Sequence, residues 1–294
     1  RQDDDKEGVW FLMVPSDSNE NERYGVFSAL KGMFSFFTIL PINIEMKEIN
    51  AMNRKFWLVP VIGLFYGLLA SFEMWALLEV LPSKMLAVAI TLFTMMFFNR
   101  FLHLDGLLDV GDGLTAVGSQ EKHVTALKDS TIGSGAFATG IFVYLITFLA
   151  MCNLDVGIPM TVAFFTLFTM CEILCRNAQV FAAAHGIPSN GMAGDSVRST
   201  GVPEAVKTLL LTLILIALVE VCVCAVLGFD AHYYTYLPVC ALIGTSASCV
   251  WGIVLSTKAN CTFGAVNGDI LGAVNESTRV IILVAFVVVL TVMI

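Results

Sequence analysis

The run FWLVPVIGLFYGLLASFEMWALLEV, residues 56–80, decides the fold class. Its only charged residues are Glu73 and Glu79, and every other side chain in it is apolar, small or uncharged. A helix of about 20 apolar residues crosses the roughly 30 Å of hydrocarbon in a bilayer. The run therefore predicts a membrane-spanning helix.

The whole chain has the same character. Of its 294 residues, 57% are hydrophobic and 14% are charged, whereas soluble domains carry about 25% charged residues. This composition argues against a soluble domain, a disordered chain and a fibrous protein. The eight cysteines form no C-x-x-C pair and no zinc-type cluster with histidine, so a disulfide scaffold is not expected. The net charge of −8, without a basic stripe, excludes a nucleic-acid-binding protein.

We therefore predict an all-α, polytopic helical bundle with about seven transmembrane helices. The predicted spans are Phe56–Val80, Met85–Phe98, Phe137–Asn153, Met160–Ala184, Val206–Phe229, Tyr233–Ser256 and Val280–Ile294. Before them, Gly25–Pro41 is apolar but short for a span, which predicts an interfacial or re-entrant helix. Residues 1–24 are acidic and polar and predict a mobile tail. Residues 25–294 then form one membrane-embedded domain.

Lysine and arginine are distributed unevenly between the two sides of this arrangement. The segment before the first span and the loops 99–136, 185–205 and 257–279 hold most of them, whereas the other loops hold only Lys84. Loops rich in lysine and arginine stay in the cytoplasm. We therefore predict a multi-pass protein of the cell (inner) membrane, with its N-terminus and these three loops in the cytoplasm and its C-terminus outside.

The most informative polar stretch is HLDGLLDVGDG, residues 103–113. The i, i+4, i+7 spacing places Asp105, Asp109 and Asp112 on one helical face. Three stacked carboxylates repel one another unless a cation neutralises them, and oxygen ligands favour Mg²⁺, with Mn²⁺ as the alternative. The simpler interpretation is a solvated acidic face. His103 falls on the opposite face, where a structural hydrogen bond and a catalytic role fit the sequence equally well.

The same loop continues with KDSTIGSG, residues 128–135. Small residues before a predicted span suggest a helix N-terminus whose backbone N–H groups bind an anion. Asp129 would complete a metal site there, and Lys128 would pair with phosphate. A simple N-cap turn explains the pattern equally well.

The third polar stretch is FGAVNGDILGAVNE, residues 263–276, in the last predicted loop. Asp269 and Glu276 are again seven residues apart, although a charged loop that enters a helix would look the same. If this loop meets residues 103–113, their acids would surround metal ions and a pyrophosphate.

Four ionisable side chains fall inside predicted spans, where charges are costly and are often functional. They are Glu73, Glu172, Arg176 and Glu220. Glu172 and Arg176 are four residues apart and can pair on one helix. Arg176 is either a clamp for substrate phosphate or part of this structural ion pair. Glu73 and Glu220 are expected to make polar contacts between helices.

Taken together, HLDGLLDVGDGL, then KDSTIG, then GDILGAVNE, with FFTILP (residues 36–41) as the opening motif, resembles the cobalamin synthase family. The resemblance covers nearly the whole chain from about Gly25. These enzymes are membrane-embedded adenosylcobinamide-GDP ribazoletransferases. Two positions depart from the family pattern, because Ile39 and Thr131 stand where arginine is usual. Arg100, Arg176 or Arg198 would have to replace those charges.

The resemblance implies a reaction. The 3′-hydroxyl of α-ribazole, or of its 5′-phosphate, attacks the phosphorus next to cobinamide in adenosylcobinamide-GDP, and GMP leaves. It implies that Asp105, Asp109 and Asp112 hold the metal, with Asp129 and Asp269 as further ligands or as the group that activates the hydroxyl. Either His103 or Asp129 would be the general base. The expected substrate-binding residues are Thr38, Lys128, Ser130, Gly133, Arg176, Asn177, Gly268, Asn275 and Glu276. The oligomeric state is left open, and a homo-oligomer is compatible with the sequence.

Two other functions compete with this one. A CDP-alcohol-type membrane phosphotransferase shares the chemistry but requires the string D-x-x-D-G-x-x-A-R, which the chain lacks. A divalent-cation transporter would use the acids within the spans as a pathway. Transporters usually concentrate polar groups at mid-membrane between repeated halves, whereas the acids here gather in loops.

Overall fold

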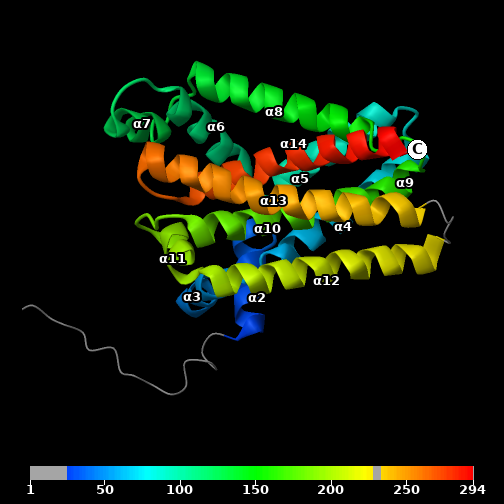
Figure 1. Ribbon diagram of the computed structural model, residues 1–294, viewed down its shortest axis with the longest axis horizontal. Coiled ribbons are helices and arrows are strands. Elements are labelled where there is room, and N and C mark those ends of the chain that lie inside the picture. Colours follow the sequence, from blue (N-terminus) through cyan, green and yellow to red (C-terminus); the bar gives the residue numbers. More distant parts are fainter. Residues whose placement is uncertain (1–24, 228–232, 294) are drawn as a thin grey trace, which may run out of the picture.

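The computed structural model describes residues 25–227 and 233–293, which form helices joined by short connections (Figure 1). Within those ranges, extended pairing is confined to an isolated bridge between Pro188 and Val266. The all-α prediction is therefore confirmed. The predicted mobile tail, residues 1–24, lies outside the described residues.

The elements follow one another in a simple order. They are α2 (Val26–Phe37), α3 (Met46–Arg54), η1 (Phe56–Leu58), α4 (Pro60–Val80), α5 (Lys84–Phe98), α6 (Leu102–Thr115), α7 (Gln120–Leu127), α8 (Ser134–Cys152), α9 (Met160–Ala163), η2 (Phe164–Phe168), α10 (Thr169–His185), α11 (Met192–Ser199), α12 (Val202–Leu227), α13 (Tyr233–Phe263) and α14 (Gly268–Met293).

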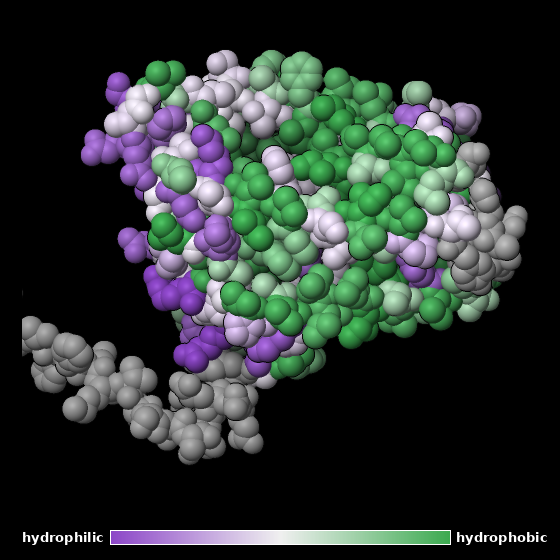
Figure 2. Space-filling view, viewed as in Figure 1, coloured by the Kyte–Doolittle hydropathy of each residue, from purple (hydrophilic) through white to green (hydrophobic). Residues whose placement is uncertain are grey.

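The structure supports six to seven membrane crossings, where about seven were predicted. Among the described residues, six segments are long and apolar enough to span, namely Phe56–Val80, Ser134–Cys152, Met160–His185, Val202–Val226, Thr235–Phe263 and Gly268–Met293. Helix α5, the predicted span 85–98, is only 15 residues long and is followed by α6 after a bend of 89°, so a seventh crossing requires these two helices to form one broken span. The long helices lie side by side in Figure 1, and their surface is largely apolar in Figure 2, where polar side chains gather at the end that carries α6, α7 and α11. We refer to this end as the polar end.

Several predicted boundaries are wrong, and one of them changes the site. The last span begins at Gly268 and not at Val280, and α13 continues to Phe263. The predicted loop 257–279 is therefore mostly helix. Asn275, Glu276 and Arg279 are buried against other helices, so they need no contact with water, whereas Thr257 and Lys258 are exposed. Likewise, the predicted loop 99–136 contains α6 and α7, and the loop 185–205 contains α11.

Helix α10 forms the centre of the bundle. Almost all of its side chains are buried, and α4 and α13 pack closely on it through glycine. A Cβ atom at Gly63 would lie 2.4 Å from the carbonyl oxygen of Glu172, and one at Gly252 would lie 2.4 Å from that of Ala178. Small residues let membrane helices approach at this distance. The polar residues of α10 are therefore enclosed by protein.

The bend between α5 and α6 sets the direction of the Asp-rich helix. Arg100 and Phe101 have φ of 56° and 57°, a left-handed conformation that is uncommon outside glycine. The Arg100 guanidinium donates to the carbonyl oxygens of Ser35 and Phe36 at 3.1 and 2.8 Å. These carbonyls end α2, the short helix that runs across the long ones in Figure 1. The bend thus anchors α6 at the polar end.

Candidate active site

The candidate site forms where α6 crosses α14. A Cβ atom at Gly106 would lie 2.7 Å from the carbonyl oxygen of Asp269, so only glycine permits this contact. The crossing joins the two acidic stretches that the sequence separates by more than 150 positions. Asp105 and Asp269 line the same cavity. The expectation that these two stretches meet is therefore confirmed.

The cavity has a volume of about 110 Å³. Its walls come from α2, α3, η1, α6, α10, α11 and α14, and the two carboxylates share it with a largely apolar surface. The apolar wall is made by Phe36, Phe37, Met52, Phe56 and Met192. We call this space the aromatic cavity. It combines two kinds of surface, one suited to a flat apolar group and one suited to a cation.

The carboxylates at the site repel one another. Burial, followed by the negative charges of Asp269, Asp105 and Asp112, raises the pKa of Asp109 to about 6. Asn267 donates to the carboxylate of Asp269 at 2.7 Å and caps α14 through a hydrogen bond from the backbone N–H of Ile270. This excess of negative charge is the physical condition that a bound cation would relieve.

Asp112 has a different environment from Asp105 and Asp109. Its two carboxylate oxygens accept hydrogen bonds from the backbone N–H groups of Gly133 and Ala136, at 2.7 and 2.9 Å. A Cβ atom at Gly133 would lie 2.5 Å from Asp112 Oδ1, so glycine leaves room for this cap. The predicted anion-binding N-terminus of α8 thus holds a carboxylate of the protein itself, and this contact pins α6 to α8.

The segment of Lys128, Asp129 and Ser130 is exposed. Asp129 Oδ1 accepts from the backbone N–H and the hydroxyl of Thr131, at 2.9 and 2.8 Å, and these bonds hold the pKa of Asp129 below its usual range. A carboxylate with a lowered pKa is a weaker base. The charge of Lys128 acts weakly on Asp269, but Lys128 does not line the cavity.

His103 is buried beside the cavity, with 2% of its surface exposed. Arg176 Nη1 lies 2.9 Å from its Nε2. A guanidinium only donates, so Nε2 is the acceptor and Nδ1 carries the hydrogen. Glu276 Oε1 lies 3.8 Å from Nδ1, whereas the amide nitrogen of Asn99, 3.3 Å from Nδ1, is also a donor and cannot accept from it. Burial and the neighbouring guanidinium groups hold the pKa of His103 well below its usual range. Because its basic nitrogen is occupied, this geometry does not favour His103 as the general base.

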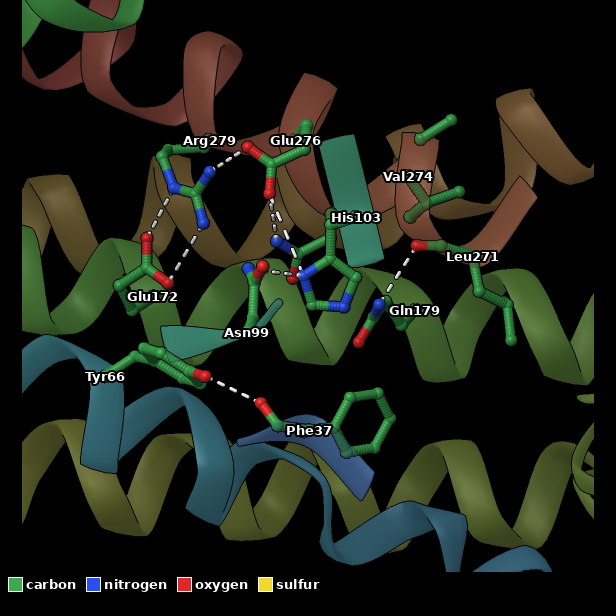
Figure 3. A network of polar contacts seen from close by, with 12 residues as sticks. Phe37, Tyr66, Asn99, His103, Glu172, Gln179, Leu271, Val274, Glu276 and Arg279 are labelled. Atoms are coloured by element: carbon green, nitrogen blue, oxygen red, sulfur yellow. Dashed lines mark hydrogen bonds and ion pairs between the residues drawn. The ribbon is translucent and has the colours of Figure 1, made fainter. Parts of the chain in front are cut away.

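An ion network lies deeper in the bundle, next to the cavity (Figure 3). The Arg279 guanidinium donates to both oxygens of Glu172, at 2.6 and 3.3 Å, and also to Glu276. Glu276 further accepts from the hydroxyl of Tyr144 at 3.0 Å. The predicted Glu172–Arg176 pair is wrong, because Arg279 from α14 occupies the Glu172 carboxylate. Sequence reasoning missed Arg279, although its position three residues after Glu276 is a signal for pairing on a helix.

Arg176 links this network to the wall of the cavity. Besides His103 it donates to Gln179 Oε1 at 3.2 Å, and its guanidinium lies 5.3 Å from the ring centre of Phe37 and 5.6 Å from that of Tyr66. Tyr66 in turn donates to the carbonyl oxygen of Phe37 at 2.6 Å. Arg176 therefore lies behind His103 and Gln179, which themselves face the cavity.

The remaining predicted substrate-binding residues divide into two groups. Gly268 lines the cavity, whereas Thr38, Asn177 and Asn275 are buried in contacts between or within helices. Asn177 donates to Ser248 and accepts from Thr212, which ties α10 to α13 and α12. These contacts place Asn177 away from the cavity. Their role in substrate binding stays a prediction.

The carboxylates at the site are the groups that could bind a metal ion. Across residues 25–227 and 233–293, no three His, Cys, Asp or Glu side chains are arranged as they would be around a single ion. The donors nevertheless fit Mg²⁺ in kind, because Asp105, Asp109 and Asp269 offer oxygen atoms only. Their mutual repulsion, expressed in the raised pKa of Asp109, also favours a cation. The metal ligands stay a prediction.

Comparison with known proteins fixes the family. Residues 29–287 match the family model of cobalamin-5-phosphate synthase. The chain belongs to this family. It is 30% identical over 268 residues to the adenosylcobinamide-GDP ribazoletransferase of Methanosarcina mazei, which covers 89% of this chain and 92% of that protein. It is 27% identical over 275 residues to the enzyme of the same name from Methanococcoides burtonii, with coverage of 91% and 94%. The resemblance drawn from the Asp-rich string is thus confirmed.

The match extends over almost the whole length of these relatives. A third one, the adenosylcobinamide-GDP ribazoletransferase of Methanosarcina barkeri, is 27% identical over 89% of this chain and 92% of its own length. No solved structure matches the chain. The cobalamin-5-phosphate synthase family is therefore established from sequence, and the arrangement of its acidic residues here comes from the described fold.

Proposed function

We propose that this protein joins α-ribazole, or its 5′-phosphate, to adenosylcobinamide-GDP and releases GMP, giving adenosylcobalamin or its 5′-phosphate. Membership of the cobalamin-5-phosphate synthase family supports this transferase reaction, as do relatives named for it. We place the reaction at the cytoplasmic face of the cell (inner) membrane, because the acidic stretches lie at the polar end and the basic loops belong to that side.

One observation carries the proposal. The Gly106–Asp269 crossing brings two acidic stretches, distant in sequence, to one cavity with an apolar wall. A pyrophosphate with an organic group on each side needs such a mixed surface. The cavity lies at the polar end and beside the apolar body, so a large, partly apolar substrate can rest against the bundle while its nucleotide stays in water.

The chemistry requires few protein groups. The 3′-hydroxyl oxygen forms a bond to the phosphorus next to cobinamide and gives its proton to a carboxylate of the site or to water. The bond from that phosphorus to the oxygen of GMP breaks, and GMP leaves with the electron pair. Such a displacement depends on in-line positioning and on cations near the developing charge. Mg²⁺, or Mn²⁺, held by Asp105, Asp109 and Asp269 would supply that charge. Lys128 adds a positive charge outside the cavity, while Asp112 holds α6 in place by capping α8.

The proposal is tested with the full chain in detergent. Adenosylcobinamide-GDP, α-ribazole and Mg²⁺ are added, and GMP and adenosylcobalamin are measured together. We expect equal amounts of both products, and a loss of at least about a hundredfold in Asp105→Asn, since removal of a group that acts in the transition state costs about this much. Asp155→Asn is the matched control, because Asp155 pairs with Lys84, the first residue of α5, and does not line the cavity. If no GMP forms with either metal, the proposed function is wrong.

A further inference from the structure

The aromatic cavity has polar wall groups that are already satisfied by the protein. The hydroxyl of Ser196 donates to Asn53 Oδ1 at 2.8 Å. Gln179 donates to the carbonyl oxygen of Leu271 at 3.0 Å and accepts from Arg176. His103 is held by Arg176. Apart from the amide nitrogen of Asn53, the uncharged surface that remains for a ligand is therefore largely apolar.

The size of the cavity limits what can occupy it. Its volume of about 110 Å³ is smaller than that of an engineered apolar cavity of about 150 Å³ that takes benzene, so it holds part of a fused ring system. A corrin ring system is many times larger and cannot enter. A flat ring system can enter edge first, with the rest of its molecule extending through the mouth.

The apolar wall of the cavity suits one of the two heterocyclic bases in the substrates, guanine or the base of α-ribazole, better than the other. Guanine carries donors and acceptors along its edge, and each would lose its hydrogen bond to water without a partner in the cavity. The base of α-ribazole, a dimethylbenzimidazole, is apolar over most of its surface. Phe36, Phe37 and Phe56 offer ring faces and edges for it, while Met52 and Met192 offer adaptable thioethers. The apolar base fits this surface better.

We propose that the aromatic cavity binds the base of α-ribazole, between α3 and α11. This inference rests on the proposed function. It assigns a binding site to α-ribazole, one of the two substrates. The 3′-hydroxyl lies one sugar ring away from the base. A base in this cavity therefore brings the attacking oxygen toward Asp105 and Asp269, which line the same cavity. Adenosylcobinamide-GDP then lies outside the cavity, against its mouth.

Ala193 on α11 offers a direct test. Ala193 lines the cavity. A Cβ atom built at Gly268 would lie 3.7 Å from the Cβ of Ala193. Ala193→Leu fills the space near Asp269 without adding charge. Ser199→Leu is the matched control, because Ser199 is exposed on the same helix and does not line the cavity. Both variants are compared with the unmodified chain in detergent.

Two measurements are made on each protein. Calorimetry gives the Kd for α-ribazole, and for free 5,6-dimethylbenzimidazole, without any turnover. Kinetics of GMP release give the KM for α-ribazole and for adenosylcobinamide-GDP separately. We expect Ala193→Leu to weaken both binding constants and to raise the KM for α-ribazole by about tenfold or more, with little change in the KM for the GDP substrate. Ser199→Leu should match the unmodified chain.

The outcomes separate this inference from the proposed function. If GMP is released normally and Ala193→Leu changes the KM for adenosylcobinamide-GDP but not for α-ribazole, the cavity holds the donor and the inference is wrong. If the unmodified chain binds neither α-ribazole nor the free base, the inference is also wrong. If the base binds and Ala193→Leu weakens it, but no GMP forms, the cavity assignment stands and the proposed reaction fails.

Discussion

Replacing Asp109 by asparagine should stabilise the metal-free protein while removing its activity. Burial and three neighbouring carboxylates raise the pKa of Asp109 from 3.8 to about 6. Each pH unit between the two values corresponds to about 1.4 kcal/mol, which gives about 3 kcal/mol as an upper bound. The carboxyl group is partly exposed, so solvent screening reduces the effect to about 1–3 kcal/mol.

The pH dependence has a definite sign. A carboxyl whose pKa is raised on folding contributes stability below its ordinary pKa, and this contribution is lost as the pH rises through the folded pKa. The unmodified chain should therefore lose stability between about pH 4 and 6 from this group, and Asp109→Asn should not. At pH 7.5 the variant should melt about 2–6 °C higher in the absence of metal.

The assay is thermal unfolding in detergent, followed by tryptophan fluorescence, with and without Mg²⁺. Mg²⁺ should raise the Tm of the unmodified chain, because it neutralises the carboxylates, and should raise that of Asp109→Asn much less. Asp195→Asn is a control, since Asp195 is exposed and paired with Arg198. If Asp109→Asn melts at or below the unmodified chain from pH 5 to 8 without metal, the carboxylates do not repel one another and the reasoning for a cation site fails.

Three further changes test the positioning of the site. Gly106→Ala places a Cβ atom 2.7 Å from the carbonyl oxygen of Asp269, so we expect GMP release to fall by about tenfold or more as α6 moves away from α14. His103→Gln should keep the shape of the pH–rate profile, and loss of its acidic limb would identify His103 as the base after all. Arg279→Met leaves two buried carboxylates without their cation and should cost about 3–5 kcal/mol in thermal unfolding; Lys84→Met, which breaks a partly exposed pair, should cost at most about 1 kcal/mol.

Apolar run length and charge placement were sufficient to predict the helical class and the approximate number of spans. They failed at the start of α14, because the rule that polar residues lie outside the membrane does not hold for side chains that other helices enclose. Glu276 and Arg279 neutralise each other inside the bundle, so the span begins at Gly268. Hydropathy along a single helix contains no information about such partners.

The candidate site shows the same limit. Helical spacing correctly grouped Asp105 and Asp109, but it assigned Asp112 the same environment, because spacing says nothing about the neighbouring helix. In the fold, Asp112 faces the N-terminus of α8 and accepts two backbone N–H bonds. The wall formed by α3 and α11 could not be predicted either, since Asn53 and Ser196 meet across 143 positions of sequence. Only the packed structure brings them together.

The buried ion network and the aspartates at the polar end differ in net charge. This difference distinguishes a structural role from a functional one. In the buried network, Glu172 and Glu276 face Arg279, with Arg176 behind them, so negative and positive charges offset each other. At the polar end, four aspartates influence one another and Lys128 interacts with one of them. Asp112 offsets part of this repulsion by capping α8, whereas Asp109 gains no such partner and its pKa is raised. The imbalance therefore supports the proposal that a cation binds among Asp105, Asp109 and Asp269.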